Sequence, residues 1–192
     1  SEINGLGQNS FRIFDTTSGA RGGLFMDFFE LLDKRYSVRA YLPDDIEPEK
    51  IQKVLEAARL APTACNLQAF KVVVAKTEGR KEEIGRIYPR GWFADAPYII
   101  AVCSEKGKGW VRSDGKNFAD VDASIVMDHI ILAATALGLG TCWIGAFDPK
   151  AAAEVLGLDG DLEPIVLTPL GYPKGGQPPK RRKSLEELVI YR

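Results

Sequence analysis

The first of three segments that could carry chemistry is RYSVRAY, in which Arg35, Ser37 and Arg39 occupy alternate positions. Alternate residues of an extended chain point to the same side, so two guanidinium groups and one hydroxyl can face a single ligand. That combination suits a phosphate or another anion. Taken alone, the segment also fits a basic turn in contact with solvent.

The other two segments are APTACNLQAF (61–70) and KRRK (180–183). In the first, Pro62 ends a helix, small residues that allow close approach of a ligand follow, and the amides of Asn66 and Gln68 can read both donors and acceptors. Taken alone, it could equally be a loop that leads into a strand. The basic KRRK cluster, taken alone, is typical of a solvated run of charge.

The glycine-rich stretch GLGTCWIG (138–145) invites comparison with a dinucleotide-binding loop. That fingerprint needs three glycines as G-x-G-x-x-G, placed after a strand and before a helix. Here Gly138 and Gly140 fit, but Trp143 takes the third position and the stretch follows a long helix. The helix N-terminus that would bind a pyrophosphate is therefore missing.

Composition excludes several other chemistries. His129 is the one histidine, so a His-rich metal site is impossible, and no G-x-S-x-G motif accompanies it. The cysteines, Cys65, Cys103 and Cys142, are odd in number and lack CxxC spacing, which favours a reduced, cytoplasmic protein without zinc. A net charge of −1 gives no drive towards nucleic acid, and no apolar run reaches membrane-spanning length.

Periodicity predicts the elements that must position these segments. Apolar spacing and strand-length apolar runs predict helices over 24–34, 48–60, 78–87, 122–138 and 149–157, and strands over 70–75, 98–102 and 163–172.

The helix over 122–138 is apolar nearly all round, with Asp122 as a plausible N-cap and Gly138 as a plausible C-terminal glycine. Such a helix is buried on all sides. In a chain of 192 residues, that indicates burial against a second subunit. The polar loop that precedes it, over 104–121, contains Trp110 and is long enough to indicate a function.

Five segments occur in an order and spacing that resemble the nitroreductase family of flavoproteins: RYSVRAY, APTACNLQAF, LAATALGLGTCWIGAF, LTPLGYP and KRRKSLEELV. The resemblance runs from about residue 28 to the C-terminus. It implies an α+β fold, a mostly antiparallel central sheet flanked by helices, in an intertwined homodimer. The helix over 122–138 would lie in the middle of the dimer, and SLEELVIYR would reach over the partner. We expect residues 1–23 to form a flexible N-terminal arm and residues 24–192 a single FMN-binding domain.

The resemblance also implies which residues bind FMN, at the interface between the two chains. Arg35 would pair with the phosphate, Ser37 would bond the phosphate or ribityl region, and Arg39 would lie by the pyrimidine edge. Tyr36 stands in the same segment, where family members often have His. Lys180 and Arg182 match the family's phosphate-binding K-x-R.

Two further groups of cofactor-binding residues follow from the resemblance. The partner's loop would run along the ribityl chain and ring, through Pro62, Thr63, Ala64, Asn66 and Gln68. GLGTCWIG would bring backbone against the isoalloxazine face through Trp143, Ile144 and Gly145, with an N–H from Ile144 or Gly145 near flavin N5.

The implied activity is transfer of hydride from NADH or NADPH through flavin N5 to a small acceptor such as a nitroaromatic or a quinone. The flavin carries the chemistry, so no catalytic side chain and no metal is expected. Trp110 and Arg112 are expected to line the acceptor site. We expect no nucleic-acid or membrane partner.

Two alternatives stay open. One is a flavin-binding protein of the same fold without NAD(P)H turnover, or a member of a flavin-modifying or dehalogenating branch. The other is an interaction module that uses KRRK to hold nucleic acid or another anion.

Overall fold

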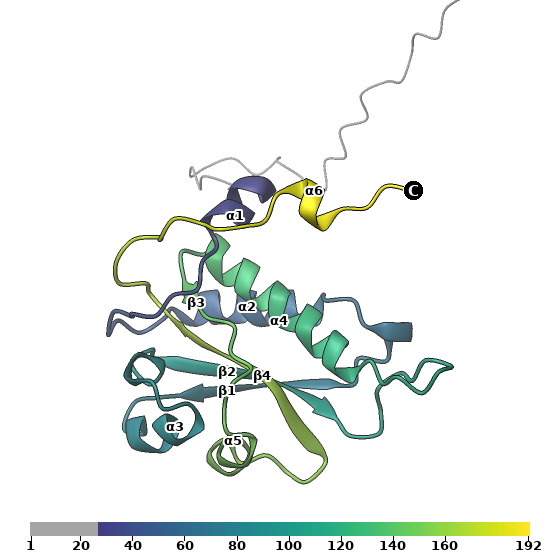
Figure 1. The fold of residues 1–192 in the computed structure, drawn as a ribbon. Coiled ribbons are helices and arrows are strands. Elements are labelled where there is room, and N and C mark those ends of the chain that lie inside the picture. Colours follow the sequence, from purple (N-terminus) through teal and green to yellow (C-terminus); the bar gives the residue numbers. More distant parts are fainter. Residues whose placement is uncertain (1–26) are drawn as a thin grey trace, which may run out of the picture.

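A four-stranded antiparallel sheet lies at the centre of the protein (Figure 1). The computed structural model describes residues 27–192, so the arm expected over residues 1–23 lies outside the described residues. The strands lie in the order β1-β2-β4-β3, and every neighbouring pair is antiparallel. Their bounds are β1 Phe70–Lys76, β2 Tyr98–Glu105, β3 Gly140–Thr141 and β4 Leu162–Gly171. The predicted α+β class and mostly antiparallel sheet are confirmed.

The central strand β2 carries apolar side chains on both faces, because both faces are covered by helices. Ile100 and Val102 join one buried cluster, while Ile99 and Ala101 join the other, as the two-residue repeat of a strand requires. Figure 1 shows one pair of helices above the sheet and another pair below it. The upper pair is α2 (Pro48–Arg59) and α4 (Ala119–Ala136), and the lower pair is α3 (Lys81–Ile87) and α5 (Pro149–Leu156).

The start of α4 differs from the prediction. The helix begins at Ala119, and the N-cap position belongs to Phe118 rather than to Asp122. The Asn117 side chain accepts a hydrogen bond from the Ala119 N–H (2.8 Å), which satisfies an amide at the helix start. Asp122 therefore lies within the first turn of the helix rather than at its cap, and its side chain is buried.

The end of α4 follows the prediction. Gly138 adopts φ +75°, a left-handed conformation that favours glycine. The Leu139 N–H then donates to the carbonyl of Ala134 (2.8 Å), which turns the chain from α4 directly into β3.

One side of α4 is buried against the sheet and the other is open in the single chain. Val126, Met127 and Ile130 are fully buried, whereas Val121 is 38% exposed and Leu132 is half-buried. One chain thus covers this apolar helix on one side only. Within the part of the chain that is described, no helix has the length and apolar character needed to span a bilayer.

The polar stretch before α4 is an ordered hairpin. Val111 pairs with Asn117 across it, and the Phe118 N–H donates to the Trp110 carbonyl (2.9 Å). The ring of Trp110 meets that of Phe118 edge to face, with centroids 5.1 Å apart.

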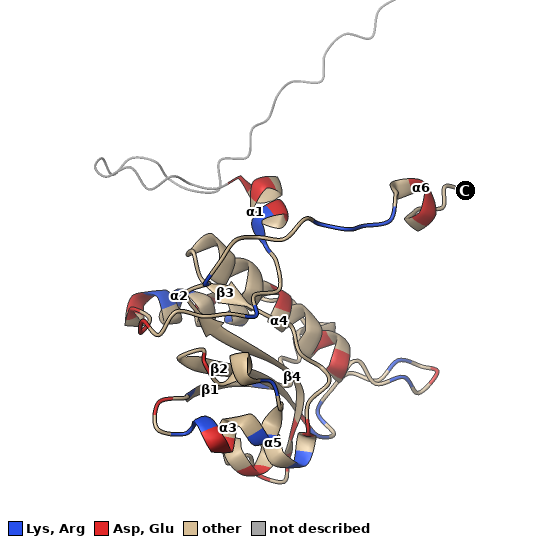
Figure 2. Cartoon of the chain, turned by 60° about the vertical axis from the view of Figure 1, so that its left-hand side comes forward, with Lys and Arg blue, Asp and Glu red and all other residues tan. Residues whose placement is uncertain are grey.

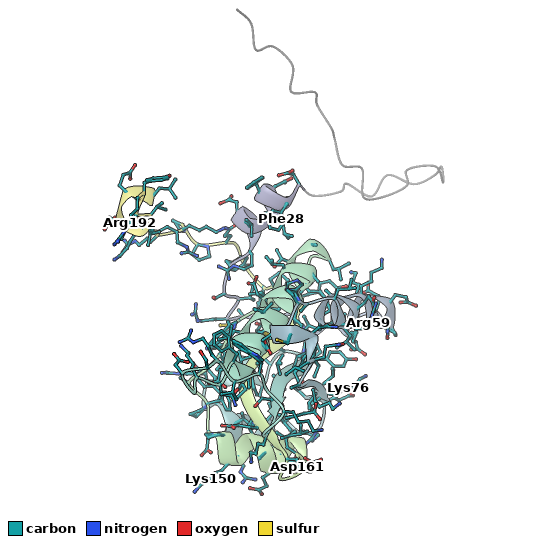
Figure 3. All side chains as sticks on the ribbon, turned by 90° about the vertical axis from the view of Figure 1, so that its right-hand side faces the viewer. Phe28, Arg59, Lys76, Lys150, Asp161 and Arg192 are labelled. Atoms are coloured by element: carbon teal, nitrogen blue, oxygen red, sulfur yellow. The ribbon has the colours of Figure 1, made fainter. Side chains whose placement is uncertain are left out.

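The two ends of the described chain lie on the same side of the molecule. The first helix, α1 (Phe28–Lys34), and the last, α6 (Leu185–Leu188), lie above the layers in Figure 1. Figure 3 shows Phe28 and Arg192 at the end of the molecule opposite Lys150 and Asp161. Neither α1 nor α6 contains a buried residue.

Candidate functional site

The segment Arg35–Tyr41 is an extended chain fastened beside β3. Ser37 forms a parallel bridge with Thr141, and the Val38 N–H donates to the Thr141 carbonyl (2.8 Å). Val38 is buried, while Arg39 on the next position is exposed. The segment therefore turns Val38 into the protein and its neighbours outwards.

The segment with Arg35, Ser37 and Arg39 runs past the buried Cys142, because Ser37 bridges Thr141, the residue before it. Burial raises the pKa of the Cys142 thiol, and the positive charges of Arg39 and Arg35 and the Ser37 hydroxyl oppose that rise. The alternate spacing thus gathers two cations and a hydroxyl on one side of the chain.

The C-terminal segment brings a third cation to this region. The Nζ of Lys180 donates to the Leu32 carbonyl (2.6 Å) and lies 3.5 Å from the Asp33 carboxylate. The side chain of Gln177 donates to the Asp33 carbonyl (2.7 Å). Lys180 therefore sits at the end of α1, immediately before Arg35. Arg182 instead donates to the carbonyl of its neighbour Arg181, farther along the segment.

In the stretch Trp143–Gly145, which follows β3, successive residues face opposite sides of the chain. Ile144 is buried, and its N–H donates to the Leu167 carbonyl (2.9 Å). Trp143 is 46% exposed and Gly145 is also exposed, so both face the opposite way. Of the two amides expected near a flavin, that of Ile144 is already engaged in the sheet. The amide of Gly145 is the better placed donor.

The loop Thr63–Gln68 lies at the other end of α4. Cys65, Asn66 and Gln68 all have φ between 51° and 54°, the left-handed region that residues other than glycine rarely adopt. The Gln68 N–H donates to the Thr63 Oγ1 (3.0 Å). The Ala64 N–H donates to the Asp122 carboxylate (2.9 Å), a contact that the sequence did not reveal.

An apolar hollow of about 380 Å³ opens beside this loop. Its lining comes from the loop, the hairpin and α4: Ala64, Cys65, Trp110, Phe118, Val121, Asp122 and Ile125. Arg112 does not line it. The guanidinium of Arg112 pairs with Asp114 (2.6 Å) and lies 5.5 Å from the centre of the Phe118 ring.

The two groups of candidate residues lie at opposite ends of α4. The helix has 18 residues, and at 1.5 Å per residue it is about 27 Å long. The loop at Ala64 contacts the first turn of α4, whereas Ser37 pairs with the strand that follows its last turn. That separation exceeds the length of a mononucleotide, so one chain cannot bring both groups to one such ligand.

No metal centre emerges among residues 27–192, where no group of three or more His, Cys, Asp or Glu side chains could hold an ion. The ring of His129 is half-buried on α4, with Nδ1 3.0 Å from the Ile125 carbonyl.

Comparisons with a family model, with solved structures and with curated proteins agree with one another. A model described as the nitroreductase family matches residues 32–90 and 88–172. The crystal structure of a nitroreductase family protein from Clostridium difficile 630 superposes with a TM-score of 0.79, at 40% identity, over 86% of this chain and 98% of that one.

Two curated relatives agree. A protein of Methanothermobacter thermautotrophicus, provisionally named NADH dehydrogenase/NAD(P)H nitroreductase, is 32% identical over 77% of this chain and 78% of its own length. The FMN reductase (NAD(P)H) of Bacillus subtilis is 27% identical over 82% of this chain and 70% of its own length.

The tight packing of Gly140 yields a first prediction. A Cβ at Gly140 would approach Val38 to 2.8 Å, and Val38 is buried and branched. We expect Gly140→Ala to lower the free energy of unfolding by about 1–3 kcal/mol, measured by urea denaturation. Gly160→Ala is the control, because no atom lies within 4 Å of the added carbon. Equal stability of the two variants would contradict the close packing of the Arg35–Tyr41 segment on β3.

Proposed function

This chain belongs to the nitroreductase family, and we propose that it passes hydride from NADH or NADPH, through bound FMN, to a small acceptor such as a nitroaromatic or a quinone. The names of the relatives support the reaction class and both cofactors, since they include NAD(P)H nitroreductase and FMN reductase. The observation that carries the proposal is the segment beside β3, where Ser37 bridges Thr141 and Lys180 contacts the residues just before Arg35.

The residues beside β3 fit FMN by their chemistry. Two groups would hold the phosphate: the guanidinium of Arg35 with the hydroxyl of Ser37, and the ammonium of Lys180, which the C-terminal segment brings next to Arg35. Gly145 has no side chain and Trp143 is exposed, so the chain there leaves an open face for a flat ring. We assign Tyr36 and Arg182 to the same site as flanking contacts.

Bound FMN supplies the hydride chemistry at N5, and the chain supplies charge and position. Arg39 is exposed on the same segment, and its cation would favour negative charge on the pyrimidine edge of the ring. The amide of Gly145 would donate a hydrogen bond at the ring. No protein acid or base is needed for these roles.

The proposed enzyme is a homodimer, in which the loop Thr63–Gln68 of one chain completes the FMN site of the other. The distance between the two ends of α4 supports this arrangement, because one chain cannot bring both groups to one flavin. Apolar side chains left exposed at the chain ends support it too. They belong to α1 and the C-terminal segment, and include Phe28, Phe29, Leu185, Leu188, Ile190 and Tyr191.

The C-terminal segment has the form of an arm for a partner. In Figure 2 the C-terminal segment passes α1 as an extended stretch, partly coloured blue for Lys and Arg, and reaches α6 away from the layers. Ile190 is 79% exposed and Tyr191 is 91% exposed. Exposed apolar side chains of this size favour an interface.

The acceptor would bind in the hollow beside Trp110. Its walls are mostly apolar, and the Trp110 ring is held edge to face against Phe118. Such walls suit a flat aromatic molecule. Arg112 contributes through the hairpin rather than by direct contact, because Asp114 already pairs with it.

A visible absorption spectrum tests the proposed function first. We expect purified protein to be yellow, to bleach without oxygen when NADH or NADPH is added, and to regain its colour with a nitroaromatic or a quinone. Bleaching identifies the hydride donor. Yellow protein that neither donor bleaches would instead support a flavin-binding protein without NAD(P)H turnover. Colourless protein that cannot be loaded with FMN would refute the proposal.

Replacement of Trp110 tests the acceptor site. We expect Trp110→Ala to raise the KM for aromatic acceptors roughly tenfold, equal to about 1.4 kcal/mol of lost contact, with FMN still bound. Arg112→Ala is the matched control on the same hairpin and should change that KM by less than about threefold. Unchanged steady-state kinetics of Trp110→Ala with every acceptor would exclude the hollow as the acceptor site.

A charge introduced into the C-terminal arm tests whether this arm stabilises the proposed dimer. We expect Ile190→Asp to raise the dimer dissociation constant at least about tenfold, because an apolar side chain on each chain loses its buried contact. Sedimentation equilibrium measures this constant. Lys150→Asp places a carboxylate at the opposite end of the molecule (Figure 3) and should leave the dimer intact. A wild-type chain that sediments as a monomer would contradict the proposed assembly.

A further inference from the structure

The side chain of Asp122 is a buried carboxylate that the proposed chemistry does not use. It is 3% exposed, and it lies in the first turn of α4. Its Oδ1 accepts the Ala64 N–H at 2.9 Å, while its Oδ2 has no hydrogen-bond partner within the described residues. A buried carboxylate with an unsatisfied oxygen destabilises a fold, and an apolar side chain would pack there at lower cost. Stability alone does not explain Asp122.

The loop that Asp122 contacts is conformationally strained. Cys65, Asn66 and Gln68 all lie in the left-handed region, at φ 51°, 54° and 51°. Each such residue costs free energy and persists only where its surroundings hold it. Strain of this kind clusters at ligand-binding loops.

Most hydrogen bonds of this loop are internal. The Asn66 N–H donates to the Thr63 carbonyl (2.9 Å), and the Gln68 side chain donates to the Asn66 carbonyl (3.1 Å). They shape the loop but do not place it on the fold. The Phe70 N–H donates to the Gln68 carbonyl (2.8 Å) where the loop continues into β1. Among the described residues, the bond from Ala64 to Asp122 is the hydrogen bond that joins the loop to an element distant in the sequence.

The position of Asp122 on α4 makes it a rigid anchor. The helix packs along the sheet, and the N-terminal end of its backbone is the end that favours a negative charge. The same residue, Asp122, lines the apolar hollow together with Trp110. A shift of the loop away from Asp122 would therefore alter both the flavin contact and the acceptor pocket.

We propose that Asp122 is a positioning residue, whose carboxylate holds the loop Thr63–Gln68 in the strained conformation that FMN binding requires. The inference rests on the proposed function, because that function brings this loop to the flavin of the partner chain. Asp122 touches neither flavin nor acceptor in this role. It acts through the Ala64 amide.

The experiment compares Asp122→Ala, Asp122→Asn and Asp120→Ala in the full-length holoenzyme. Flavin fluorescence on dilution gives the dissociation constant of FMN, and peptide-resolved hydrogen exchange reports on the loop amides. We expect Asp122→Ala to weaken FMN binding at least tenfold and to speed exchange over residues 63–68 at least tenfold. The amide oxygen of Asp122→Asn can still accept the Ala64 bond, so this variant should stay within about threefold of wild type. Asp120→Ala removes an exposed carboxylate from the same helical turn and should match wild type.

A second variant guards against failure of Asp122→Ala to fold. Ala64→Pro removes the N–H donor and leaves the carboxylate in place. Ala64 opens a 3-10 turn, and Thr63 before it is extended, so proline is compatible with the backbone there. We expect Ala64→Pro to weaken FMN binding and loosen the loop as Asp122→Ala does.

Three results would overturn the inference. They are wild-type FMN affinity with wild-type loop exchange in Asp122→Ala, the same result in Ala64→Pro, and an Asp122→Asn variant as impaired as Asp122→Ala. A wild-type chain that binds no FMN would sink the proposed function instead. Hydrogen exchange over the loop tests the positioning role whether or not flavin binds. Failure of the positioning role can therefore be told apart from failure of the proposed function.

Discussion

The packing of α4 along the sheet is the constraint on which the rest of the structure depends. Val126, Met127 and Ile130 fix the helix on the face formed by β2 and β4, and they leave it no freedom to slide. Its length then sets the distance between the loop at Ala64 and the strand that pairs with Ser37. A chain with candidate cofactor-binding residues at both ends of one rigid helix would be suited to share two sites between two copies. The apolar side of α4 that one chain leaves open points to the same arrangement.

The two halves of the candidate site are held by different means. Beside β3, the segment Arg35–Tyr41 is fastened by backbone hydrogen bonds and by contact of Val38 with Gly140. That half is rigid because it extends the sheet. At the other end, the loop Thr63–Gln68 lies outside the sheet and carries three left-handed residues. It leads directly into β1, and a side chain of α4 accepts a hydrogen bond from its Ala64 amide.

Most of the fold could be predicted from the sequence, because its elements are strongly periodic. The helix over 48–60 and the strands over 70–75 and 163–172 correspond to α2, β1 and β4 within one or two residues. The start of α4 could not be predicted in this way. Asp122 has the residue type of an N-cap, but the hairpin before it lets Asn117 take part of that role. Nothing local in the sequence distinguishes a capping aspartate from one that reaches a loop 58 residues earlier in the chain.

The candidate site, like the fold, could be predicted from the sequence only where local pattern decides it. The grouping of Arg35, Ser37 and Arg39 was predictable, since it follows from the alternation of an extended chain. The engagement of the Ile144 amide was not, because it depends on a bridge to Leu167 that forms only in the folded sheet. The partners of Arg112 and Lys180 were likewise set by tertiary contacts. Local pattern therefore identifies which residues are candidates to bind a cofactor, and the packing around α4 decides which of them lie together.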